Sequence, residues 1–114
     1  MNVYRAWKRG PLNDYVNTIY VDTFDDLTKR QTTVFETEGT ISGIEISVDG
    51  KIQGTGTLII AYNDTTIYKE YKLDSGMVDI NHKSDWYADK CEVTFLPTNS
   101  TKGKLEISCD FIGD

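Results

Sequence analysis

The residues of this chain that could do chemistry gather between Asp79 and Asp89, around the single histidine, His82. Acids on both sides of an imidazole have the composition of a general acid–base site. A reaction of that kind also needs an activated nucleophile, and no serine of the chain stands in a Gly-x-Ser-x-Gly turn. We therefore predict a hydrogen-bonded or solvated histidine and no enzymatic activity.

The same stretch offers oxygen atoms to a metal ion. Calcium binds carboxylate and amide oxygens, and four side chains supply them: Asp79, Asn81, Asp85 and Asp89. Their spacing departs from the Asp-x-Asx-x-Asx-Gly calcium loop. Zinc prefers four nitrogen and sulfur ligands, whereas the chain has two cysteines with no histidine or further cysteine near them. We predict no metal site and no cofactor.

An aromatic pair, Trp86–Tyr87, raises the possibility of a ligand-binding loop. Aromatic faces with amide and carboxylate groups beside them suit a sugar ring and its hydroxyls. The alternative is that Trp86 closes an open end of the fold and buries its ring, which is the commoner fate of a large aromatic side chain. The candidate ligand-binding residues are Asn81, Asp85, Trp86, Tyr87 and Asp89.

The elements that must position these residues are strands. In 91–95 and 105–111 every second residue is apolar, and a turn-rich segment, 97–103, separates the two runs. A hairpin centred near Ser100 would give the cross-strand pairs Cys91–Cys109, Val93–Ile107 and Phe95–Leu105. Such a pairing would permit a disulfide. Without a secretory signal, we expect free thiols buried in the core.

The alternating pattern continues through most of the chain. Asp49–Gly50 predicts a tight hairpin between two such runs, and residues 63–66 predict another turn. Residues 22–30 could form one or two helical turns, with Thr23 as the N-cap and Lys29 near the C-terminal end. His82 and the aromatic pair fall in a loop expected over 81–90.

These patterns predict an all-β protein. The expected architecture is an antiparallel β-sandwich, jelly-roll-like, with about eight strands and one short helix. The chain of 114 residues has the size of one domain. We assign residues 1–16 to an extended N-terminal arm and residues 17–114 to the sandwich.

Charge divides the arm from the body. Arg5, Lys8 and Arg9 give the first ten residues a charge of +3, and the net charge of −6 then leaves −9 on the remainder. A body of that charge repels phosphates, so nucleic acid is not an expected partner. The arm residues expected to dock on a neighbour or on the chain's own body are Tyr4, Arg5, Trp7, Lys8 and Arg9.

The first residues lack the apolar core of a secretory signal, and no apolar run approaches a membrane span. We expect synthesis in the cytoplasm, with incorporation into a virion as one destination, and no membrane partner.

Three functions fit these observations. The first is a non-catalytic structural module that assembles through its arm with itself or another structural protein, as in phage decoration, tail or adaptor proteins; this is an analogy of architecture. The second is a carbohydrate- or receptor-binding module. The third is an acidic inhibitor of a basic partner protein.

Overall fold

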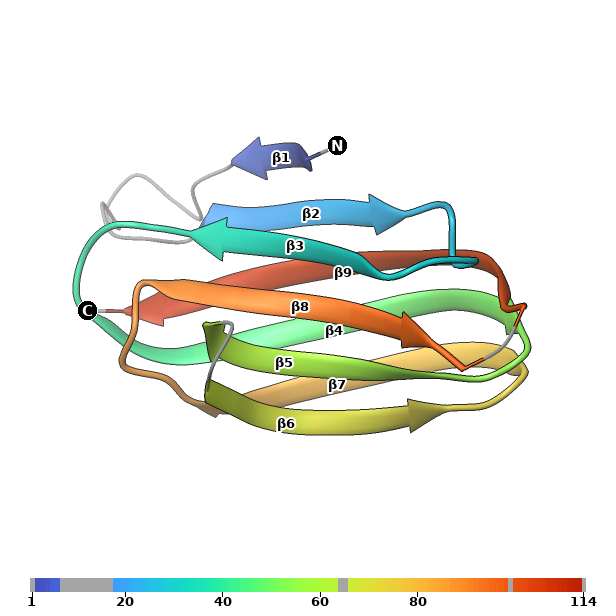
Figure 1. Cartoon of the computed structure of the whole chain (residues 1–114). Coiled ribbons are helices and arrows are strands. Elements are labelled where there is room, and N and C mark those ends of the chain that lie inside the picture. Colours follow the sequence, from blue (N-terminus) through green and yellow to red (C-terminus); the bar gives the residue numbers. More distant parts are fainter. Residues whose placement is uncertain (1, 7–17, 64–65, 99, 114) are drawn as a thin grey trace.

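The computed structural model describes residues 2–6, 18–63, 66–98 and 100–113, and these residues form nine β-strands and no helix (Figure 1). The strands are β1 (Asn2–Ala6), β2 (Thr18–Phe24), β3 (Gln31–Glu36), β4 (Ile41–Gln53), β5 (Gly56–Asn63), β6 (Thr66–Leu73), β7 (Gly76–Asp85), β8 (Lys90–Pro97) and β9 (Lys102–Gly113).

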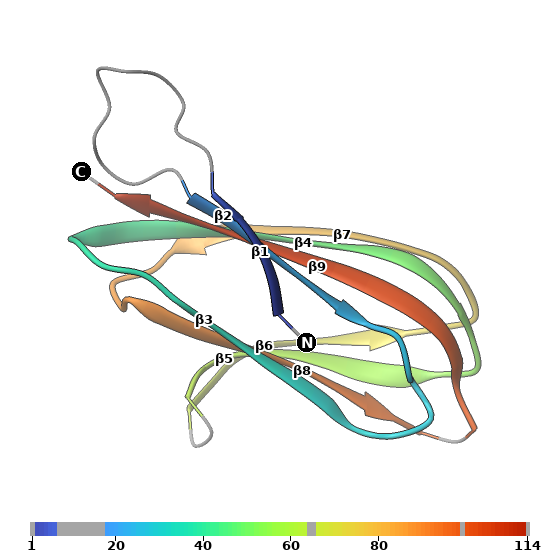
Figure 2. The same ribbon diagram turned by 90° about the horizontal axis from the view of Figure 1, so that it is seen from above.

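The strands build two antiparallel sheets that face each other (Figures 1 and 2). One sheet has five strands in the order β1-β2-β9-β4-β7, and the other has four in the order β3-β8-β5-β6. The predicted all-β sandwich is confirmed. It has one strand more than expected, because residues assigned to the arm form β1.

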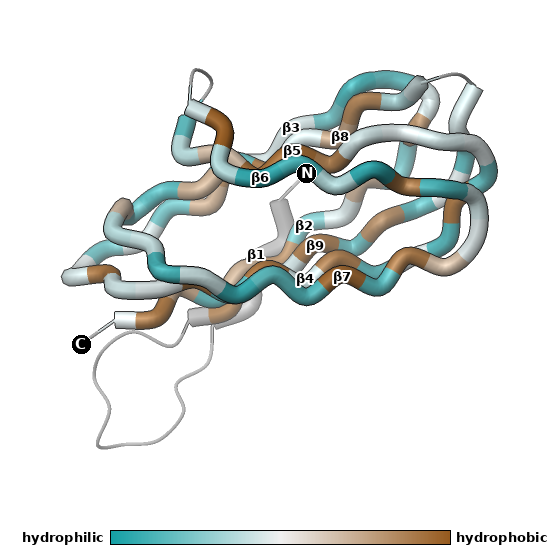
Figure 3. The backbone as a smooth tube through the Cα atoms, turned by 90° about the horizontal axis from the view of Figure 1, so that it is seen from below, coloured by the Kyte–Doolittle hydropathy of each residue, from teal (hydrophilic) through white to brown (hydrophobic). Residues whose placement is uncertain are grey.

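Alternating apolar side chains of both sheets meet in one core. In Figure 3 the hydrophobic residues recur along the strands between hydrophilic ones. Ile44, Ile46 and Val48 of β4 are fully buried, as are Leu58 and Ile60 of β5. Each such side chain contributes roughly 1.5–3 kcal/mol by leaving water, so the two-residue period is the main determinant of the fold.

The predicted terminal hairpin is wrong. Strand β8 pairs with β3 and β5, whereas β9 pairs with β2 and β4, so the two runs belong to opposite sheets. The connection between them crosses the end of the sandwich, where the buried Thr101 hydroxyl donates to the Thr55 carbonyl oxygen at 2.7 Å. This arrangement gives both runs hydrogen-bonded neighbours on two sides.

The predicted turn at Asp49–Gly50 is also wrong, because β4 continues through it to Gln53. Gly50 pairs with Val78 on one side and Leu105 on the other. A Cβ atom on Gly50 would lie 2.1 Å from the Lys104 carbonyl oxygen. The glycine therefore allows β4 and β9 to approach each other closely. Besides bulges and bends, such a close backbone approach is a common reason for a glycine inside a strand.

No helix forms over residues 22–30. Strand β2 extends to Phe24, and a turn follows in which an Asp26 carboxylate oxygen accepts hydrogen bonds from the backbone and hydroxyl of Thr28. These bonds lower the pKa of Asp26. Such local bonds compete with helix formation, and the fully buried Leu27 holds the turn against the core.

The turn at residues 63–66 is confirmed as the β5–β6 hairpin, in which the Thr66 amide donates to the Asn63 side chain at 2.9 Å. The next element differs from expectation. Strand β7 runs on to Asp85, so His82 and Asn81 are strand residues and the expected 81–90 loop shrinks to 86–89.

Candidate functional site

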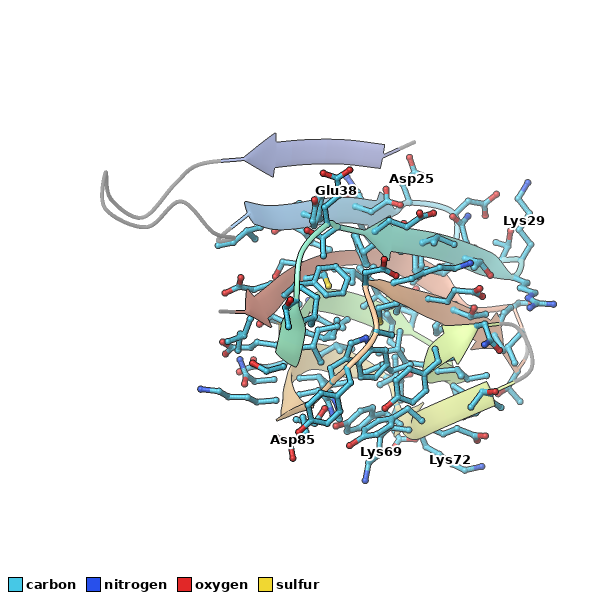
Figure 4. All side chains as sticks on the ribbon, turned by 90° about the vertical axis from the view of Figure 1, so that its left-hand side faces the viewer. Asp25, Lys29, Glu38, Lys69, Lys72 and Asp85 are labelled. Atoms are coloured by element: carbon cyan, nitrogen blue, oxygen red, sulfur yellow. The ribbon has the colours of Figure 1, made fainter. Side chains whose placement is uncertain are left out.

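One end of the sandwich is filled by an aromatic cluster around Trp86. Its ring is 0% exposed and stacks on Tyr62, with centroids 4.0 Å apart and an interplanar angle of 18°. Tyr68 meets the same ring edge-on at 5.3 Å, and the indole nitrogen donates to the Lys90 carbonyl oxygen. Trp86 thus closes this end of the fold, onto which Figure 4 looks, and offers no face to a sugar.

His82 lies beside this cluster and is largely buried. Its Nδ1 atom is 2.9 Å from the Tyr71 hydroxyl, and its Nε2 atom is 3.1 Å from the Ser84 hydroxyl. Burial, with a smaller contribution from Lys69, lowers the pKa of His82. Both ring nitrogens therefore have a hydrogen-bond partner. In the described ranges, no group of three His, Cys or acidic residues could hold a metal ion.

The other residues of the predicted ligand loop do not gather around Trp86. Asn81 is on the outer face of the five-stranded sheet, where its amide donates to Glu45 and Ser47 at 3.0 and 3.2 Å. Asp85 is exposed at the end of β7. Neighbouring positions of a strand point to opposite faces, so Asn81 is directed away from the His82 side.

Tyr87 and Asp89 remain together at a surface hollow of about 470 Å³. Tyr87 is 75% exposed, and the remaining lining comes from Gly39, Thr40, Ile41 and Ala88. A hydrogen bond from the Thr37 amide to the Asp89 carbonyl oxygen, 2.9 Å long, joins the β3–β4 and β7–β8 connections. Residues 39–41 could not be predicted as part of this hollow, because only the fold brings the two connections together.

The N-terminal arm contributes β1, which pairs antiparallel with β2. Tyr4 lies opposite Tyr20 and Arg5 opposite Ile19 in this register. The other predicted arm residues lie outside the described part of the chain: Trp7, Lys8 and Arg9. Strand β1 is the fifth strand of its sheet, and among the described residues no strand of the four-stranded sheet lies across from it (Figures 1 and 2).

The two-layer antiparallel β-sandwich is the class that the fold defines, and comparison with known proteins adds no family. No family model matches the sequence, and no curated protein matches it either. Within the described residues, no helix is long and apolar enough to cross a membrane.

Among solved structures, similarity extends to a chain of the "Glycosylation Associate Protein (Gap123) complex from Streptococcus agalactiae". The TM-score is 0.40 and the sequence identity 8%, and the match covers 98% of this chain. It covers 45% of the other chain, so this protein spans less than half of that chain's length. A likeness of this degree carries no argument about function.

Proposed function

We propose that this protein is a non-catalytic assembly module whose N-terminal strand pairs with β2 of a neighbouring copy. The observation that carries the proposal is the position of β1. Without it, four strands face four strands, and β2 to β9 supply the core described above. Strand β1 adds a fifth position that no described strand of the opposite sheet covers.

The connection between β1 and β2 is long enough for such an exchange. Residues 7–17 separate two strands that pair with each other, whereas an antiparallel hairpin commonly closes with two to five residues. A fully extended segment of that length reaches roughly 36–40 Å. The two shorter dimensions of the molecule are 27 and 21 Å, so the segment can span to a neighbour packed alongside.

The edge of β2 would accept a neighbour's strand by the same backbone hydrogen bonds that it makes with its own β1. An uncovered edge is a template for strand addition. Charge favours the contact in either case, because the first ten residues carry +3 and the remainder −9. Arms passed from copy to copy produce head-to-tail contacts that close into rings or continue as tubes. A virion component, such as a decoration, tail or adaptor protein, uses assemblies of that kind.

Light scattering of the full chain tests the proposal. We expect a mass that rises with concentration, and we expect Trp7→Ala or removal of residues 1–6 to shift it to that of a folded monomer. Tyr87→Ala, in the β7–β8 connection, is the matched control and should leave assembly unchanged. Unaltered oligomers in both arm variants, or a monomer at every concentration, would refute the assembly role.

A second candidate, carbohydrate binding, draws on the hollow beside Tyr87. An exposed phenol ring with the Asp89 carboxylate and Thr40 hydroxyl nearby matches the pairing of apolar face and polar groups that sugars require. A glycan array probed with the native protein and with Tyr87→Ala tests it. Met77→Ala is the control, because Met77 is 78% exposed and does not line the hollow. Equal signals from the native protein and Tyr87→Ala would exclude this site.

A further inference from the structure

The two cysteines occupy matching positions in the two sheets. Cys91 lies opposite Phe35 of the adjacent β3, and Cys109 lies opposite Tyr20 of the adjacent β2. The rings of Tyr20 and Phe35 meet across the core, with centroids 6.4 Å apart. Because their strand neighbours touch at this level, the two cysteines are brought to the same level of the core from opposite sheets.

The two cysteine side chains are therefore neighbours across the core, and both residues are 0% exposed. Burial, followed by the influence of the neighbouring Cys91, raises the pKa of the Cys109 thiol well above its ordinary value. Both side chains are free cysteines in this structure. The sequence-based pairing of Cys91 with Cys109 in a hairpin was wrong in its geometry, yet the fold brings the same two residues together.

We propose that Cys91 and Cys109 close into a disulfide bond between the two sheets when the chain folds in the presence of a disulfide oxidant such as oxidised glutathione. Strand β8 is held between β3 and β5, and β9 is held between β2 and β4. The bond therefore joins interior strands of both layers and braces the sandwich across its core.

The reaction is ordinary thiol–disulfide exchange. One cysteine thiolate attacks a sulfur atom of oxidised glutathione, forms a mixed disulfide and releases one glutathione thiolate. The second cysteine thiolate then attacks the protein sulfur of the mixed disulfide, forms the Cys91–Cys109 bond and releases the second glutathione. Two protein thiols are oxidised, one glutathione disulfide is reduced, and the two protons pass to the glutathione thiolates.

Burial decides when the bond can form. The thiolate is the reacting species, and a buried thiol of raised pKa supplies little of it. Glutathione also cannot reach a fully buried sulfur atom without an opening of the sandwich. Oxidation is therefore coupled to folding, and the completed bond is shielded from reductants in the same way.

Refolding of the full chain in oxidised and in reduced glutathione tests the proposal. After oxidative refolding, we expect a monomer lacking two thiol hydrogens in its intact mass, with a linked peptide containing Cys91 and Cys109. Its unfolding temperature should exceed that of the reduced form by roughly 5–15 °C, and a reductant added to the unfolded protein should abolish the difference. The folded, reduced protein should react with the same oxidant at least about tenfold more slowly than the refolding chain.

Cys91→Ala is the control, because it leaves one thiol and should give no internal bond and no temperature difference. If Cys91→Ala folds poorly, the comparison of the oxidised and reduced forms of the native chain still tests the proposal. Two free thiols after oxidative refolding, or disulfides that join only separate molecules, would overturn the proposal.

Discussion

Adjacent residues of the 86–89 connection have opposite environments, and their energetics should differ accordingly. Trp86 is 0% exposed and stacked on Tyr62, whereas Tyr87 is 75% exposed. Removing a buried indole ring leaves a cavity, and we expect Trp86→Ala to lower the free energy of unfolding by about 3–5 kcal/mol. Tyr87→Ala should change it by less than about 0.5 kcal/mol.

Urea unfolding of both variants measures this difference. Equal losses of stability in Trp86→Ala and Tyr87→Ala would mean that Trp86 does not close the end of the sandwich. The sequence did not decide whether Trp86 is buried in the fold or exposed to a ligand, because composition alone does not say which of two neighbouring aromatic residues points inward.

His82 should make stability depend on pH. Burial lowers its pKa below the usual 6.5, and Lys69 adds to this effect. The unfolded chain then binds more protons than the folded chain in mildly acidic solution. The stability contributed by the neutral imidazole is complete above pH 6.5 and is lost as the pH falls through the lowered pKa.

Urea unfolding at a series of pH values from 7.5 downward checks this, with His82→Gln as the comparison. Carboxylates titrate in both proteins, so the difference between them isolates the histidine. The native protein should lose more stability than His82→Gln below pH 6.5. A smaller loss in the native protein would contradict the lowered pKa.

At the scale of elements, the two-residue period predicts strands but not their partners. The runs 91–95 and 105–111 alternate in the same way whether they form one hairpin or belong to two sheets. Their partners are β3 and β5 for the first run, and β2 and β4 for the second. Those strands lie far away in the sequence, so no local pattern distinguishes the two arrangements.

The role of Gly50 was also ambiguous in the sequence, because a turn and a close approach of two strands both favour glycine. We expect Gly50→Ala to destabilise the protein by about 1–3 kcal/mol, since the new methyl group would overlap the Lys104 carbonyl oxygen. Asp49→Ala, on the exposed neighbour, should have little effect. Thermal unfolding of the two variants measures this, and a neutral Gly50→Ala would argue for a loose or different β4–β9 pairing.

At the scale of the whole molecule, β2 to β9 form two facing sheets of four strands each. Strand β1 is an additional edge strand of one sheet. The sequence predicted an arm from its charge, but charge cannot say whether the arm's partner is the same chain or another. The position of β1 at the edge of the five-stranded sheet supports the proposed exchange between copies.

The most direct test asks which copy supplies β1. Val3 lies opposite Val21 in the β1–β2 register. One preparation should carry Val3→Cys and a second Val21→Cys, and the two should be mixed, unfolded, refolded together and oxidised. Val3→Cys mixed with Thr57→Cys, which places the thiol on the four-stranded sheet, is the control.

If β1 is exchanged between copies, the mixture should yield far more covalent dimer than the control mixture, and the dimer should be linked between positions 3 and 21. A single chain carrying both substitutions would distinguish the alternative. If that chain forms the 3–21 bond only within itself and the mixture yields no more dimer than the control, β1 belongs to its own sandwich and the assembly account is contradicted.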